Sequence, residues 1–333
     1  MIPTVGITLG DPCGIGAELV ARLLSDRSVT EGARVLLIGD RWLLERGLQQ
    51  AGVELDVPAV SALGHTLLEP GIPTLLEHET VKPEEVRMGE ALEAGGRSVL
   101  TGLKHALDLA RDGTIDAITF APLNKHAMHL AGYGFADELH WFAQELGHQG
   151  HFCELNVLED LWTSRVTSHV ALKDVAELID EDGIVDAVHL VNSSLKAAGV
   201  DRPRIGVAAL NPHAGDGGIF GREEIDIIRP AVERTRAEQI HVDGPFPSDT
   251  IFLKARDGEY DAIVTMYHDQ GQIAMKLMGF DRGVTVQGGL PVPITTPAHG
   301  TAFDIAGKGV ANPDAMKNAF RIARRMGANR RAS

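Results

Sequence analysis

The feature that most constrains the fold is an alternation of short apolar runs with amphipathic stretches along nearly the whole chain. Runs such as Ala262 to Met266 have the length and composition of buried strands. Stretches such as Arg41 to Ala51 have apolar residues at helical spacing and are followed by glycine or proline. Strands that alternate with helices predict an α/β protein with three layers, α/β/α.

Composition and charge narrow the classes of function. The chain has 333 residues, which allows two domains or one large α/β unit, and 44% hydrophobic residues are enough for a full core. The formal net charge of -15 argues against nucleic acid or an anionic membrane surface as a partner, because both favour a basic protein face. The 2 cysteines fit no disulfide framework, and no apolar run reaches the ~18 residues that span a membrane. We therefore expect a cytoplasmic protein, for which a small organic anion remains a suitable ligand.

The glycine-rich segment after the first predicted strand is the obvious candidate for a nucleotide loop. Val5 to Leu9 leads into Gly10-Asp11-Pro12-Cys13-Gly14-Ile15-Gly16. The spacing is not GxGxxG, and Pro12 stands where that fingerprint requires a flexible turn. We expect a tight βα loop here, and not a classical Rossmann dinucleotide site.

Three histidines fall at or beside the ends of predicted strands. His268 follows the strand 262–266, His213 follows a strand that ends near Leu210, and His169 lies in a predicted strand from Arg165 to Ala171. Strand ends line the ligand crevice of open α/β sheets, and a catalytic divalent metal takes about three protein ligands. On spacing alone, three unrelated histidines that cap loops explain the pattern at least as well.

A set of longer motifs resembles the 4-hydroxythreonine-4-phosphate dehydrogenase family. They are, in order along nearly the whole chain, GDPCGIG, TSHVAL, LNPHAGDGG, FPSDT, YHDQG, HGTAFDIAGKG and ANP. The resemblance implies two domains around a cleft, in a fold like that of isocitrate and isopropylmalate dehydrogenases. We place the first domain, on the cofactor side, at 1–130 plus 295–333. The second, at 131–294, would hold the metal ligands and the interface of a homodimer with a shared active site.

The same resemblance implies NAD, a divalent metal and specific residues around them. The metal would be zinc, with manganese, cobalt, nickel or magnesium as alternatives. Its ligands, drawn from both subunits, would be His169, His213 and His268. The residues beside NAD would be His299, Gly300, Thr301, Gly289 and Asn312. Lys276 would hold a carboxylate or relay a proton, and Asp249 would orient a substrate hydroxyl or the metal shell.

The positions expected to contact substrate depart from the family pattern. Where phosphate-binding members have His-Thr, this chain has Glu138 and Leu139; the family's Arg is Ile294, and its Asn is Thr285. A carboxylate in a phosphate pocket repels the ligand at close range. The cations left near the substrate would be Lys125 and, for a second substrate carboxylate, His140 or Arg282.

These departures predict that the oxidation is retained and the phosphate is not. Within the same superfamily, the terephthalate cis-dihydrodiol dehydrogenases oxidise an unphosphorylated ring acid, and Leu139, Trp141 and Ile294 would suit a flat ring. We therefore predict NAD- and metal-dependent oxidative decarboxylation of a β-hydroxy acid, a terephthalate cis-dihydrodiol, to protocatechuate. The alternatives are a 4-hydroxythreonine-4-phosphate dehydrogenase of pyridoxal phosphate biosynthesis, a four-carbon sugar-acid 4-phosphate dehydrogenase, or a non-catalytic sensor of metal or organic acid.

Overall fold

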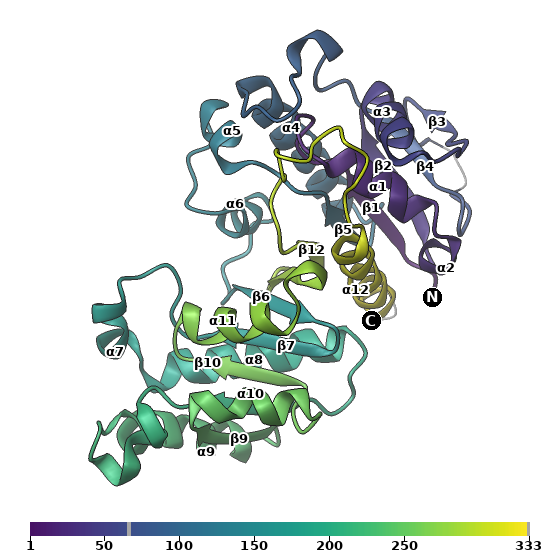
Figure 1. The fold of residues 1–333 in the computed structure, drawn as a ribbon. Helices are drawn as coiled ribbons and strands as arrows, with labels where there is room; N and C mark the ends of the chain where they lie inside the picture. Colours follow the sequence, from purple (N-terminus) through teal and green to yellow (C-terminus); the bar gives the residue numbers. More distant parts are fainter. Residues whose placement is uncertain (65–67, 332–333) are drawn as a thin grey trace. The chain divides into compact units, whose positions relative to one another are not determined.

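A computed structural model describes residues 1–64 and 68–331 (Figure 1). The chain divides into two compact units: unit 1 comprises Met1–Gln149 and Leu290–Ser333, and unit 2 comprises Gly150–Gly289. Unit 1 is therefore built from both ends of the chain, with unit 2 inserted between them. The segment 131–149, which the sequence interpretation placed in the second domain, lies in unit 1 because Trp141 and Phe142 are buried in its core.

Unit 1 contains a parallel sheet with strand order β3-β4-β2-β1-β5-β12. The strands are β1 (Thr4–Thr8), β2 (Arg34–Gly39), β3 (Ala59–Val60), β4 (Thr74–Glu77), β5 (Ala117–Phe120) and β12 (Ile294–Pro297). The helices are α1 (Gly16–Leu24), α2 (Arg27–Thr30), α3 (Arg41–Ala51), α4 (Glu93–Arg111), α5 (Lys125–Leu130), α6 (Glu138–Glu145) and α12 (Asp314–Arg330). Every residue of β1 is buried, as expected for a central parallel strand covered on both faces.

Two apolar clusters cover the two faces of the unit 1 sheet. One joins β1 and β2 to α1, α3 and α12, and includes Leu19, Leu43 and Phe320. The other joins the opposite face to α4 and α6, and includes Leu103 and Phe142. Local signals fix the helix ends: the side chains of Asn124 and Asp137 cap α5 and α6, and Gly52, with φ 64°, ends α3 in the left-handed conformation.

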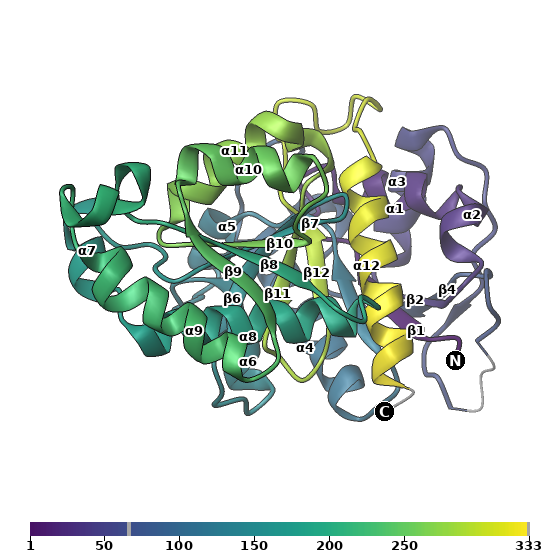
Figure 2. The same ribbon diagram turned by 90° about the horizontal axis from the view of Figure 1, so that it is seen from below.

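Unit 2 has strand order β11-β6-β7-β10-β8-β9, in which only β6 is antiparallel to its neighbours among the described strands. The strands are β6 (Cys153–Leu158), β7 (Leu161–Arg165), β8 (Arg204–Ala208), β9 (His241–Phe246), β10 (Ala262–Thr265) and β11 (Val284–Gly288). The α-helices are α7 (Val175–Leu178), α8 (Glu181–Ala197), α9 (Arg229–Ala237), α10 (Ser248–Arg256) and α11 (His268–Gly279). Figure 2 shows α10 and α11 on one face of these strands and α8 and α9 on the other.

The predicted α/β class with helices on both faces of the sheet is therefore confirmed, while several boundaries differ. The predicted strand Arg165 to Ala171 is wrong, because β7 ends at Arg165 and His169 lies in the loop that follows. Helix α4 begins at Glu93, after a separate 3-10 turn at Pro83–Glu85. Both cysteines are free thiols, as expected. In the described ranges, no helix is both long and apolar enough to cross a membrane.

Candidate active site

Four parallel strands of unit 2 end at the same edge of the sheet. β7, β10, β8 and β9 are successive neighbours, and the segments after them carry His169, His268, His213 and Asp249, respectively. Adjacent strands lie about 4.8 Å apart, so the fold brings these four side chains to one edge although His169 and His268 are 99 positions apart in sequence. This is the edge at which open α/β sheets bind ligands.

His169 and His268 are the pair that the fold brings together most closely. Their ring centroids lie 5.7 Å apart and the rings are tilted by 42°. Nδ1 of His268 is 2.7 Å from Oδ1 of Asp269. If Nδ1–H donates to that carboxylate, the lone pair of Nε2 is left to bind a metal ion. Imidazole nitrogen binds zinc at about 2.0–2.1 Å, and rings at this separation can reach one ion between them. The two residues thus fit a metal ion as far as one chain can supply its ligands.

His213 lies in a strained turn at the end of β8. Six successive residues from His213 to Gly218 have positive φ, and His213, Ala214 and Asp216 are not glycine. Left-handed conformations cost such residues roughly 1–2 kcal/mol each, so the turn needs an anchor. Within the part of the chain that the structure describes, no three His, Cys, Asp or Glu side chains gather as a metal site. One chain therefore does not bring His213 together with the other two histidines.

Glu224 supplies the anchor for this turn. It is buried, and its Oε1 accepts hydrogen bonds from the backbone N–H of Leu210 and Asn211 at 2.9 and 2.7 Å. Its Oε2 accepts a hydrogen bond from Nδ2 of Asn211 at 3.0 Å, and a Cβ at Gly215 would lie 2.7 Å from the same oxygen. The sequence interpretation missed Glu224, because only the tertiary structure shows what its carboxylate binds.

The two predicted catalytic residues lie on the helices that follow β9 and β10 in unit 2. Lys276 is exposed on α11, two turns after His268, and Asp249 is exposed in the first turn of α10. Neither side chain is buried in the core of unit 2.

The predicted cofactor residues are divided between the units. Gly289 is in unit 2, with φ 89° and a Cβ position only 2.4 Å from the His151 carbonyl oxygen, so this backbone requires glycine. In unit 1, the carbonyl of Thr301 accepts a hydrogen bond from Ile15 N–H at 3.2 Å, and Gly14 packs directly on Thr301. The segment His299–Gly300–Thr301 thus lies over the loop that follows β1. Asn312 Oδ1 accepts the N–H of Asp314 at 2.9 Å, a local turn at the start of α12.

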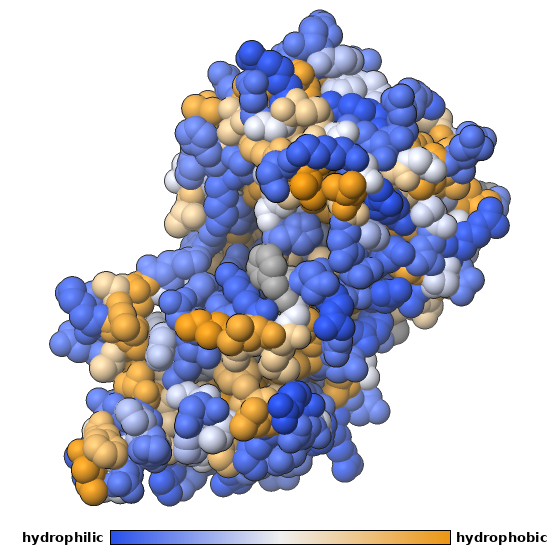
Figure 3. All heavy atoms as spheres, in the orientation of Figure 1, coloured by the Kyte–Doolittle hydropathy of each residue, from blue (hydrophilic) through white to orange (hydrophobic). Residues whose placement is uncertain are grey.

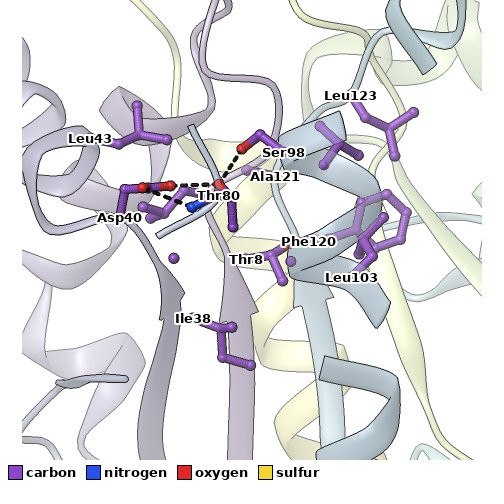
Figure 4. Close-up of a pocket in the computed structure, with 15 residues that line it drawn as sticks. Thr8, Ile38, Asp40, Leu43, Thr80, Ser98, Leu103, Phe120, Ala121 and Leu123 are labelled. Carbon is purple, nitrogen blue, oxygen red and sulfur yellow. Dashed lines mark hydrogen bonds between the residues drawn. The ribbon is translucent and has the colours of Figure 1, made fainter. Parts of the chain in front are cut away.

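Unit 1 has its own cavity at the carboxyl ends of β1, β2 and β5 (Figure 4). Thr80 connects its polar wall: Oγ1 donates to Oδ2 of Asp40 at 2.5 Å and lies 2.6 Å from the Ser98 hydroxyl. The volume of about 20 Å³ accommodates one water-sized molecule and is too small for a dinucleotide. This cavity is therefore too small to be the binding site of either the expected cofactor or the expected substrate.

The predicted substrate residues have two different environments. Glu138 is buried and its Oε2 lies 3.4 Å from Nζ of Lys125, while Nδ1 of the exposed His140 is 2.6 Å from Oδ1 of Asp137. By contrast, Leu139 is on the buried side of α6, and Ile294 is fully buried in the unit 1 core. Thr285 is on β11 of unit 2, opposite Asn156 of β6, and Arg282 of the same unit forms an ion pair with Glu159.

Comparison with known proteins identifies the family of this chain. The model of the family described as pyridoxal phosphate biosynthetic protein PdxA matches residues 31–323. The chain belongs to the PdxA family. A Pseudomonas aeruginosa relative, provisionally named 4-hydroxythreonine-4-phosphate dehydrogenase 2, is 54% identical over 328 residues, which is 98% of this chain and 97% of the relative. The D-threonate 4-phosphate dehydrogenase of Salmonella typhimurium is 37% identical, with 96% and 98% of the two chains covered.

Solved structures of PdxA relatives agree with this assignment. The 4-hydroxythreonine-4-phosphate dehydrogenase of Klebsiella pneumoniae superimposes with a TM-score of 0.85 at 34% identity, covering 98% of each chain. The terephthalate 1,2-cis-dihydrodiol dehydrogenase of Burkholderia xenovorans gives a TM-score of 0.69 at 28% identity, covering 97% of this chain and 98% of that one. The predicted resemblance and the expectation of a dehydrogenase are both confirmed at this level.

The predicted terephthalate substrate is wrong. PdxA relatives that are 34 to 54% identical over nearly the whole chain are named for phosphorylated substrates, and the terephthalate enzyme is less similar than these. The structure supplies the physical reason. Leu139, Trp141 and Ile294, assigned to a flat ring, are core residues, and Glu138 is paired with Lys125 instead of presenting a bare negative charge.

Proposed function

We propose that this PdxA family member is a metal-dependent, NAD(P)-linked dehydrogenase of a small hydroxy acid that carries a 4-phosphate. The candidate substrates are 4-hydroxythreonine 4-phosphate and D-threonate 4-phosphate, the compounds for which its relatives are named. The structural observation that supports the proposal is the His169–His268 pair at the strand edge, where α10, which carries Asp249, and α11, which carries Lys276, both begin.

The chemistry proposed for this edge is alcohol oxidation. A bound divalent metal would polarise the substrate hydroxyl and lower its pKa. Lys276, on the helix that begins at His268, would take the hydroxyl proton at Nζ or hold the substrate carboxylate. Asp249 would accept a hydrogen bond from the substrate. His213 would complete the ligand set, and zinc suits the three imidazoles well.

The cofactor and the phosphate are proposed to involve the unit 1 residues. His299, Gly300 and Thr301, which cover the loop after β1, are the proposed contacts of the nicotinamide dinucleotide, together with Gly289 and Asn312. Lys125 is the proposed cation for the phosphate, since its side chain is 54% exposed. His140 and Thr285 remain proposed substrate contacts; the burial of Leu139 and Ile294 supports only an indirect role for these two.

We also propose a homodimer. Ile273 and Leu277 on α11 are 60% and 84% exposed, and Val170 and Leu172 project from the loop after His169. Figure 3 shows apolar side chains gathered over α11 and around α7 of unit 2. Exposed apolar groups beside the proposed metal ligands suit burial against a second copy, which could bring in the third histidine.

The test is NAD(P)H formation by metal-reconstituted protein. The two 4-phosphorylated acids and their unphosphorylated counterparts would be compared with NAD and with NADP, and CO2 release would be measured in parallel. Turnover of a phosphorylated acid alone supports the proposal. Turnover of only the unphosphorylated acids overturns the phosphate assignment, and NAD(P)H formation with none of them overturns the proposed activity.

A further inference from the structure

A buried arginine lies at the end of β7, outside every set of residues assigned above. The side chain of Arg165 is 5% exposed, and each of its three nitrogens has a partner in unit 2. Nε donates to Oγ of Ser168 at 2.9 Å, Nη1 to Oδ1 of Asn156 at 3.0 Å, and Nη2 to Oε2 of Glu154 at 3.1 Å. A planar guanidinium held at three points has a fixed position and orientation.

The first of these contacts reaches the loop that carries His169. Ser168 directly precedes His169, in a loop that has left the strand ladder. Up to Thr167 the backbone is still held by β10 and its extension, through hydrogen bonds from the N–H of Val166 and Thr167 to the carbonyls of Thr265 and Met266. The bond from Arg165 to Ser168 extends this support to the residue next to the imidazole.

The second contact reaches the helix that carries His268. Oδ1 of Asn156, besides accepting from Arg165, accepts a hydrogen bond from Nε2 of Gln272 at 2.5 Å. Gln272 is one turn after His268 and one turn before Lys276, so the three residues occupy one face of α11. A bond to the middle residue of that face sets the rotation of the helix about its axis.

We propose that Arg165 is a positioning residue that holds His169 and His268 in register with each other. One arm runs through Ser168 to the His169 loop, and the other runs through Asn156 and Gln272 to α11. The proposal rests on the proposed metal site for its functional meaning. Its structural content, a coupling of two segments through one guanidinium, can be tested without metal.

The energetics favour positioning over simple stabilisation. A buried ion pair such as Arg165–Glu154 adds little net stability, because the two ions must first lose their hydration, and apolar residues of similar size often serve the fold as well. Removal of a group that hydrogen-bonds to a metal-ligating histidine typically changes metal affinity or activity 10- to 100-fold. Arg165 contacts the neighbours of the two histidines and not their rings, so we expect an effect at the lower end of this range.

Four variants test the proposal. Replacing both ions in E154L/R165M removes both arms without leaving a lone buried charge. R165K keeps the positive charge but loses the planar guanidinium that donates the three hydrogen bonds. Q272M breaks only the arm to α11. R204M is the matched control, because Arg204 also pairs with a carboxylate of unit 2, Asp261 at 2.7 Å, but at the opposite ends of the strands.

Hydrogen exchange of the metal-free protein is the first readout. In E154L/R165M, we expect faster exchange in both 166–170 and 268–276, relative to β8 and β10. Q272M should accelerate exchange only in 268–276, and R204M in neither segment. Equal protection of both segments in E154L/R165M and in the wild type overturns the proposal, as does loosening of both segments by Q272M, which would indicate general destabilisation.

Cobalt binding, followed by its visible absorption, is the second readout. We expect E154L/R165M to weaken Co2+ binding 10-fold or more, R165K to lie between it and the wild type, and R204M to stay within about 2-fold. H169A and H268A separate the two hypotheses. If they weaken Co2+ binding and E154L/R165M does not, the positioning role fails and the site stands. If H169A and H268A leave Co2+ binding unchanged, the proposed metal site is wrong. The positioning role of Arg165 is then tested by hydrogen exchange alone.

Discussion

Nζ of Lys125 lies 3.4 Å from Oε2 of the buried Glu138, so each of these two charges partly neutralises the electrostatic effect of the other on a nearby ligand. While they are paired, the carboxylate repels an anionic substrate less, and the ammonium attracts it less. We expect Glu138→Gln to lower the KM for a 4-phosphorylated substrate several-fold, because Lys125 gains freedom to bind the phosphate. Lys125→Met should raise the same KM about 10-fold, with little change for an unphosphorylated acid. Steady-state kinetics with matched substrate pairs decides this, and equal effects on both substrates would contradict the assignment.

The second prediction concerns the histidines at the unit 2 edge. His169→Ala and His268→Ala should each weaken divalent metal binding by 100-fold or more, because each removes a direct ligand. His189→Ala is the control, since this half-exposed histidine on α8 is paired with Glu238. Isothermal titration with Zn2+ measures all three. Unchanged affinity in the first two variants would remove the metal site from this edge.

Glu224 provides the third prediction. Glu224→Ala should lower the free energy of unfolding by about 3 kcal/mol, because it leaves the N–H groups of Leu210 and Asn211 buried without their acceptor. The neighbouring Glu223→Ala, which removes a single hydrogen bond to Asn211, should cost about 1 kcal/mol. Urea unfolding measures both. Similar values for the two variants would show that the left-handed turn does not depend on Glu224.

The fourth prediction is a pH dependence set by Asp11. Burial raises the pKa of this carboxyl from 3.8 to about 6, so between these values the folded protein binds more protons than the unfolded chain. The contribution of Asp11 to stability therefore falls as pH rises through this window, and it is constant above the window. Asp11→Asn should remove this pH dependence. The free energy of unfolding of Asp11→Asn minus that of the wild type should be about 1.5 kcal/mol larger at pH 8 than at pH 5.

Asp26 should show a pH dependence of stability opposite in sign to that of Asp11. Hydrogen bonds from Lys317 and Ser28 lower the pKa of Asp26 to about 2, so its contribution to stability is present above 3.8 and lost as pH falls towards 2. Asp26→Asn should therefore be destabilised at pH 8, where Asp11→Asn is most favoured. Urea unfolding of the two variants at several pH values checks the signs. A pH-independent difference between Asp11→Asn and the wild type would mean that Asp11 is not buried as described.

The fifth prediction tests the proposed dimer. Leu277→Glu, on the exposed apolar face of α11, should shift the protein from dimer to monomer in sedimentation velocity. Leu130→Glu changes a residue of unit 1 that is 48% exposed, and it should leave the oligomeric state unchanged. A wild-type monomer at micromolar concentration, or dissociation by both variants, would contradict the assignment of this face.

The sequence predicted those parts of the fold whose determinants are local. The apolar strand 262–266 and the loop that follows it placed His268 correctly at a strand end, because an apolar run with a sharp end carries its own signal. The helical spacing of Arg41 to Ala51, followed by glycine, likewise predicted α3 correctly. The end of β7 was misplaced because Val166 and Thr167 have strand-like composition, while the strand itself is set by pairing with β10.

The substrate prediction failed because burial and ligand contact look alike in one sequence. Leu139, Trp141 and Ile294 are apolar in either role, and only the packed core shows that they face away from solvent. The pairing of Lys125 with Glu138 joins two helices, and Arg165 joins two strands, a loop and a helix; no local pattern encodes either contact. These tertiary contacts decide charge and orientation, which a motif leaves open.

The discontinuity of unit 1 bears on how the chain folds as it is made. Residues 290–333 supply β12, which pairs with β5, and α12, whose Met316, Phe320 and Ala323 fill the core beneath β1 and β2. Residues 150–289 contain all the strands of unit 2 and leave the ribosome earlier. During synthesis, unit 2 can therefore complete its sheet while unit 1 still lacks a strand and a helix, and residues 1–149 must avoid aggregation until residues 290–333 are made.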